Sequence, residues 1–152
     1  MTPSIVTAAA EVPLESARAL ALWADVRRWP SFVEGFARLT ELSASWPEPG
    51  STVVWESQPG GRGRVTEKVL ERGVRRFATR VYEERLAGTH SVEVAPVEGG
   101  SRVELRLEYE LAKGGPLRAV TDLLFVRRSL RDALTRSLRR FAVEAEDDAG
   151  LR

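Results

Sequence analysis

Residues 102–111 alternate strictly between charged and apolar side chains. Successive side chains of a β-strand point to opposite faces, so this stretch predicts a strand with one wet and one dry face. Such a strand belongs to an antiparallel sheet whose dry face must be covered by another element. The residues of the dry face are Val103, Leu105, Leu107, Tyr109 and Leu111.

From Pro116 to about Asp147 the chain holds no further Gly or Pro, so this stretch predicts one helix of about 30 residues. Pro116 suits the first turn, and we expect the helix to reach about Asp147, with residues 149–152 frayed. No other expected element is long enough to cover the dry face. Its apolar residues recur at helical spacing on one side: Val120, Leu123, Leu130, Leu134, Leu138 and Phe141.

Upstream, the chain is typical of two short helices and six further strands. An Ala/Leu-rich run within residues 14–36 predicts a first helix up to Ala24, and Asp25 or Ser31 can cap a second that ends at Gly35. From residue 51 the period changes to two, with Gly-containing turns such as Ala87-Gly88. The prediction is a single α+β domain over residues 1–148, with a seven-stranded antiparallel sheet. The expected strands are 4–12, 37–42, 51–57, 63–72, 75–84, 88–97 and 101–112.

Composition excludes several classes of function. The 152 residues include 23 basic and 22 acidic side chains, and this near-balance argues against a nucleic-acid partner held through its phosphates. There is no Cys and His90 is the only His, so thiolate and multi-histidine metal sites are excluded and no cofactor is expected. We find no signal peptide and no integral membrane segment, and we expect a cytoplasmic monomer or homodimer.

Two segments, AEVPLESARALALWADVRRWPSFVEG and VEVAPVEGGSRVELRLEYEL, carry a family resemblance. Together with the order of elements they resemble the START-like (SRPBCC) superfamily of polyketide cyclase/dehydrase and lipid-transport proteins. Its Pro-x-x-Gly-Gly-Ser/Thr hairpin stands here at residues 96–101. The resemblance implies a helix-grip fold, in which a curved seven-stranded antiparallel sheet wraps around the C-terminal helix and leaves a cavity. Fold alone does not choose among carriers, receptors and cyclases, and the Ser/Arg pattern of aromatic polyketide cyclases is not matched.

The alternation rule applied to the upstream strands gives five candidate ligand-binding residues on the dry face. Trp55 would stack against a flat apolar ligand, or it fills the core. Glu67 lies between two inward valines, so its carboxyl group must be ion-paired, protonated or hydrated. It could act as an acid or base, or form a structural ion pair. Thr79 and Tyr109 would offer hydroxyl groups. His90 would donate to a ligand oxygen or act as an acid or base, or it is a hydrogen-bonded residue of the wall. Glu67 and His90 are the catalytic candidates.

Arg127 is the sixth candidate and the expected partner of Glu67. On a helical wheel it falls about 20° from the centre of the apolar stripe, so its guanidinium should face the sheet. It would pair with Glu67 or bind a ligand carboxylate; the alternative is a long side chain that extends outward beside the helix.

Two other patterns do not indicate nucleotide or nucleic-acid sites. The loop at residues 60–64 is Gly-rich, but no helix begins there to hold a phosphate, so it reads as a hairpin. The arginines of the last helix are interspersed with acidic residues, as on a solvated face.

Three functions remain open from the sequence. The leading hypothesis is a protein that binds or carries a hydrophobic small molecule of lipid, polyketide or aromatic type in an internal cavity. The alternative is a polyketide cyclase/dehydratase-like enzyme that uses Glu67 or His90 as acid or base, with Arg127 as an anion clamp. The third is an interaction module with a filled core, which would expose Trp23, Trp29 and Phe32 as a docking patch.

Overall fold

The computed structural model describes residues 4–112 and 120–151 and confirms the predicted α+β architecture. The strands are β1 (Ser4–Val12), β2 (Phe36–Leu42), β3 (Thr52–Ser57), β4 (Arg64–Arg72), β5 (Arg76–Tyr82), β6 (Leu86–Val97) and β7 (Gly100–Leu111). The helices are α1 (Ser16–Ala24), the 3-10 helix η1 (Val26–Arg28), α2 (Trp29–Phe32) and α3 (Val120–Asp148).

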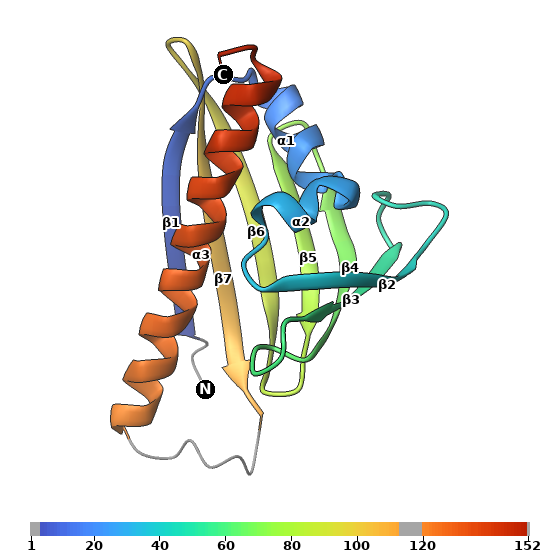
Figure 1. The fold of residues 1–152 in the computed structure, drawn as a ribbon, viewed down its shortest axis with the longest axis vertical. Coiled ribbons are helices and arrows are strands. Elements are labelled where there is room, and N and C mark those ends of the chain that lie inside the picture. Colours follow the sequence, from blue (N-terminus) through green and yellow to red (C-terminus); the bar gives the residue numbers. More distant parts are fainter. Residues whose placement is uncertain (1–3, 113–119, 152) are drawn as a thin grey trace.

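The seven strands form one antiparallel sheet in the order β1-β7-β6-β5-β4-β3-β2. Each strand from β2 to β7 pairs with its neighbour in sequence, and β1 closes the order beside β7. The sheet curves strongly, α3 crosses it along β1 and β7, and α1 and α2 lie beside α3 on the same face (Figure 1). This is the helix-grip arrangement, in which one long helix and two short ones cover the dry face of the sheet.

The dry face predicted along β7 is confirmed. Its apolar side chains are buried as far as Tyr109, whereas Arg102 and Arg106 are exposed. The predicted turn at Ala87-Gly88 is wrong, because both residues lie inside β6. Gly88 is needed there for close approach of two strands, since a Cβ at this position would lie 2.3 Å from a backbone oxygen of β7.

The C-terminal half of α3 supplies the centre of the core. Leu138, Phe141 and Ala145 are at most 2% exposed. The ring of Phe141 lies 5.1 Å from that of Trp23 and 5.2 Å from that of Phe32, which joins α3 to α1 and α2. Trp23 and Phe32 are themselves buried, as is Trp29, so the docking patch expected at the helix corner is wrong.

Backbone hydrogen bonds cap the end of α3. The N–H of Leu151 donates to the carbonyl of Glu146, and that of Gly150 donates to Asp147. Gly150 has a φ of 76°, the left-handed conformation that ends many helices. Within the described residues, no helix has the length and apolar content that a membrane span requires.

Candidate ligand-binding cavity

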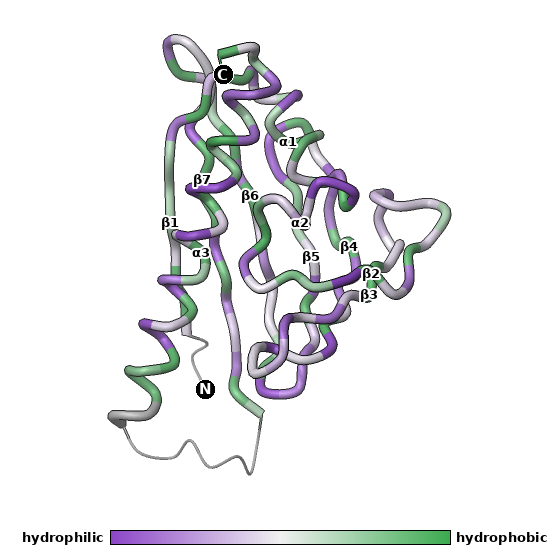
Figure 2. Tube along the Cα trace, in the orientation of Figure 1, coloured by the Kyte–Doolittle hydropathy of each residue, from purple (hydrophilic) through white to green (hydrophobic). Residues whose placement is uncertain are grey.

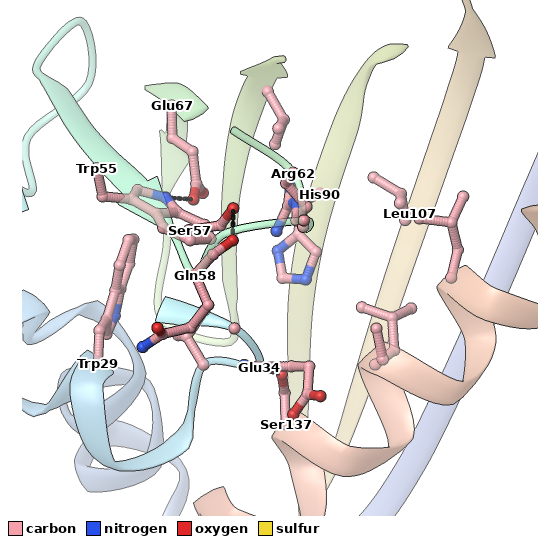
Figure 3. A pocket seen from close by; sticks show the side chains of 18 of the residues that line it. Trp29, Glu34, Trp55, Ser57, Gln58, Arg62, Glu67, His90, Leu107 and Ser137 are labelled. Atoms are coloured by element: carbon pink, nitrogen blue, oxygen red, sulfur yellow. Dashed lines mark hydrogen bonds between the residues drawn. The ribbon is translucent and has the colours of Figure 1, made fainter. Parts of the chain in front are cut away.

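A cavity of about 330 Å³ opens between the sheet and the helices. Its floor is formed by β3 to β7, one wall by α3, and the other by the turn between α2 and β2 (Figure 3). The loop between β3 and β4, residues 58–63, lies at its rim. It lies beneath the long helix, where we expected a cavity from the sequence, and its lining is mainly apolar.

Aromatic rings make up much of the cavity wall. Trp23, Trp29 and Trp55 all line it, and the ring of Trp23 packs against those of Phe32 and Phe141. The Nε1–H of Trp29 donates to the carbonyl of Trp23 at 2.7 Å, and Trp55 stacks on Phe36 with ring centroids 5.2 Å apart. These contacts fix the indole planes, so the wall is a rigid apolar surface.

Glu67 is buried, and neutral donors hold its carboxylate. The Nε1–H of Trp55 donates to Oε2 at 2.9 Å, and the hydroxyl of Thr79 donates to Oε1 at 2.9 Å. Both oxygens are thus satisfied by neighbouring strands, because β4 pairs with β3 on one side and with β5 on the other. Glu67 reaches the cavity, and each of its oxygens can accept a further hydrogen bond beside the one that it makes.

Arg127 does not pair with Glu67, so the predicted ion pair is wrong. Its side chain is exposed and lies outside the cavity lining, while the lining residues of α3 begin at Leu130. The helical period gives the direction of a side chain but not how far the sheet extends beneath the helix. The first turns of α3 reach past the start of β1 in Figure 1, and the side chain of Arg127 is exposed.

His90 projects from β6 into the cavity and stacks on Trp23, with ring centroids 5.8 Å apart and planes 16° from parallel. Burial, and to a smaller extent the Arg62 cation, lowers the pKa of His90 to about 4. The imidazole is therefore neutral at pH 7, with one nitrogen as donor and the other as acceptor. No hydrogen bond joins it to another residue in the described ranges, so both nitrogens are available to a ligand.

Arg62 is the site residue that sequence reasoning missed. Its Nε–H donates to Glu83 at 2.5 Å, and its guanidinium lies 5.1 Å from the ring centroid of Trp55. The Gly-rich loop brings it to the rim, with Gly60 and Gly63 in left-handed conformations. The loop is a hairpin, as expected, but alternation gives no direction for a loop residue.

Of the remaining candidates, neither lines the cavity. Thr79 is buried behind Glu67 and affects the cavity only through that hydrogen bond. Tyr109 is buried in a second apolar cluster with Val6, Leu86 and Leu107. Trp55, Glu67 and His90 are thus the predicted residues that the structure brings together around the cavity.

Ion pairs fasten the cavity wall near its mouth. Glu34, in the turn after α2, contacts Arg136 at 3.0 Å and Arg140 at 2.8 Å. The hydroxyl of Ser137 also accepts the N–H of Glu34 at 2.8 Å. These arginines of α3 therefore bind the protein itself and are not part of a wholly solvated face. Among the described residues, no cluster of three or more His, Cys, Asp or Glu could hold a metal ion.

Solved structures share this fold. The START superfamily protein from Mycobacterium smegmatis has a TM-score of 0.77 at 11% identity, over 94% of this chain and 97% of that one. The Zhui aromatase/cyclase from Streptomyces sp. R1128 has a TM-score of 0.78 at 13% identity, over 94% and 93%. The di-domain ARO/CYC StfQ from the steffimycin biosynthetic pathway has a TM-score of 0.79 at 16% identity, over 98% of this chain and 53% of that one.

At such identities these similarities establish the fold alone. A comparison with curated protein sequences found no match. The model of the family described as polyketide cyclase / dehydrase and lipid transport matches residues 4–146. Since this match covers nearly the whole chain, the protein belongs to the polyketide cyclase/dehydrase and lipid transport family.

Proposed function

We propose that the protein binds a hydrophobic small molecule in the cavity between α3 and the sheet. The observation that carries this proposal is the cavity itself: about 330 Å³ of mainly apolar space with a few polar groups directed into it. Ligand pockets of proteins have this composition, and the volume lies near the lower end of their usual range. The ligand is accordingly of modest size, with an apolar body that packs on the indole rings.

The polar groups of the cavity define where a polar part of the ligand would lie. Glu67 already accepts one hydrogen bond at each oxygen, from Trp55 and from Thr79, so those two directions are closed to a ligand. His90 has both nitrogens available, and it stands within electrostatic reach of Arg62. A hydroxyl or carbonyl oxygen of the ligand therefore fits beside His90, where it would hydrogen-bond the neutral imidazole.

Intrinsic fluorescence tests binding directly, because three of the four tryptophans line the cavity. Apolar probes such as 1-naphthol should quench or shift the emission of the native protein in a saturable manner. Ala133→Phe places a ring in the cavity wall and should abolish this response, whereas Ala95→Phe, on an exposed position of β6, should not. Equal responses from both variants would show that the probe binds elsewhere.

A second candidate function is acid–base chemistry on the bound ligand, favoured by the free nitrogens of His90. With a pKa near 4 the imidazole is neutral at pH 7, so it can accept or donate a hydrogen bond to the ligand, and it is a weaker base than an ordinary histidine. Glu67 suits this role less well, since both its oxygens accept hydrogen bonds. His90→Gln should abolish conversion of a 1,3-diketone substrate while affinity for it persists. Unchanged conversion would show that His90 is not the acid or base, and a native protein that converts nothing would leave only the binding function.

A further inference from the structure

The start of α3 carries an unusual exposed apolar surface. Leu123, Leu124 and Phe125 are 43%, 60% and 71% exposed, three large apolar side chains in a row. Figure 2 shows this hydrophobic stretch at the beginning of the helix, followed by a hydrophilic one. Other large exposed apolar residues, such as Leu70 and Val74, do not occur in such a run. We call residues 123–125 the helix tip.

The helix tip cannot be covered by one flat protein face. At about 100° per residue, three consecutive side chains span about 200° of the helix circumference. A helix that is apolar over such an arc is stable where an apolar medium surrounds it. The first turns of α3 also reach past the start of β1 (Figure 1), and the three side chains of the tip are exposed.

A collar of cations follows one turn later. Arg127, Arg128 and Arg131 are exposed, and none forms an ion pair with any residue in the described part of the chain. In contrast, Arg136 and Arg140 of the same helix form ion pairs with Glu34. The collar stands about 6 Å along the helix axis from the tip.

The surrounding sequence is basic as well. Residues 113–131 contain five Lys and Arg but one acidic residue, although the whole chain has a net charge of +1. A basic segment next to large apolar side chains is complementary to a surface of anionic headgroups above acyl chains. The 6 Å between tip and collar matches the depth of about 5–10 Å to which interfacial helices insert.

We propose that the helix tip and the arginine collar dock the protein on an anionic lipid bilayer. Leu123, Leu124 and Phe125 enter the interface, and the three arginines contact the headgroups. The collar lies next to Leu130, which lines the cavity, so docking places the cavity wall near the membrane surface. The proposal is independent of whether the cavity holds a ligand.

Cosedimentation with vesicles tests the docking. The native protein should bind vesicles of phosphatidylcholine mixed with phosphatidylglycerol more tightly than vesicles of phosphatidylcholine alone, and added salt should weaken the binding. The double variant L124Q/F125Q should lose at least about tenfold in affinity, from the apolar area withdrawn. R127Q and R128Q should each lose about fivefold.

Matched controls separate the surface from general charge and hydropathy. Val74→Gln removes an exposed apolar side chain elsewhere, and Arg139→Gln removes an exposed cation from the same helix; both should bind like the native protein. All these residues are exposed, so thermal denaturation midpoints should stay unchanged.

Three outcomes would overturn the proposal. The first is equal affinity of the native protein for both vesicle types, or equal affinity of the native protein and L124Q/F125Q for the anionic vesicles. The second is a native protein that is a dimer by light scattering without lipid while L124Q/F125Q is a monomer. The tip would then bind a second copy of the chain. The third is binding to duplex DNA that is tighter than binding to vesicles, and that R127Q and R128Q weaken while L124Q/F125Q does not.

Discussion

Removing the hydroxyl that binds Glu67 measures how strongly the sheet depends on this buried carboxylate. Thr79→Val keeps the side-chain shape but removes the donor to Oε1, which leaves Glu67 with the indole N–H of Trp55. A hydrogen bond to a charged group contributes about 1.5–3 kcal/mol. We therefore expect Thr79→Val to lower the free energy of unfolding by about 2 kcal/mol.

Glu67→Gln should cost less than Thr79→Val. The amide oxygen can still accept from Trp55, and the amide N–H can donate to the Thr79 hydroxyl once that hydroxyl rotates. In the Glu67→Gln background the remaining bond joins neutral groups, so Thr79→Val should then cost about 1 kcal/mol. The double-mutant cycle thus has an expected coupling of about 1 kcal/mol.

Urea denaturation followed by tryptophan fluorescence provides the four free energies. Thr89→Val serves as the control, because Thr89 lies on the adjacent strand β6 and makes no side-chain hydrogen bond with the described residues. If Thr79→Val and Thr89→Val cost the same in both backgrounds, the carboxylate of Glu67 is not held as the structure shows.

Three further predictions concern acid stability, strand packing and the helix end. The pKa of His90, about 4 in the folded state, lies below its usual 6.5 when unfolded, so stability is full above pH 6.5 and falls as pH drops toward 4. His90→Gln should flatten this fall of up to about 3 kcal/mol in denaturation curves, and NMR titration of the only His reports its pKa directly. Gly88→Ala should destabilise by about 1–3 kcal/mol in thermal denaturation, more than Gly73→Ala, whose Cβ meets no atom closer than 3.5 Å. Arg28→Ala removes the ion pairs to the last turns of α3 and should speed hydrogen exchange there, while exchange in β7 stays unchanged.

Most of the sheet could be predicted from the sequence because it depends on local rules. Two-residue alternation gives the faces of β3 to β7, and Val53, Val65 and Val92 are fully buried as expected. Gly88 shows the limit of such rules, since the same residue type serves a turn or a close strand contact. Only the register of β6 against β7 decides which of these applies.

The cavity could be predicted in outline but not in its polar contacts. Trp55, Glu67 and His90 follow from strand alternation, and all three line the cavity. Arg62 and the partners of Glu67 depend on loop conformation and strand pairing, which no single stretch of sequence specifies. The predicted position of Arg127 is wrong for a related reason: a helical wheel gives the direction of a side chain but not where the sheet ends.

The ion pairs of α3 have a mechanical consequence. Arg28 fastens its last turns, and Glu34 fastens its middle through Arg136 and Arg140. The second half of the helix is therefore held by ion pairs, the part between Val126 and Leu134 by apolar packing on the sheet, and Leu123 at its start is exposed. The lever arm from Ser137 to Leu123 is about 21 Å, so a rotation of about 10° about the ion-paired half moves Leu123 by about 4 Å. A small rotation of the ion-paired half thus becomes a larger displacement at Leu123, while the aromatic contacts around Phe141 change little.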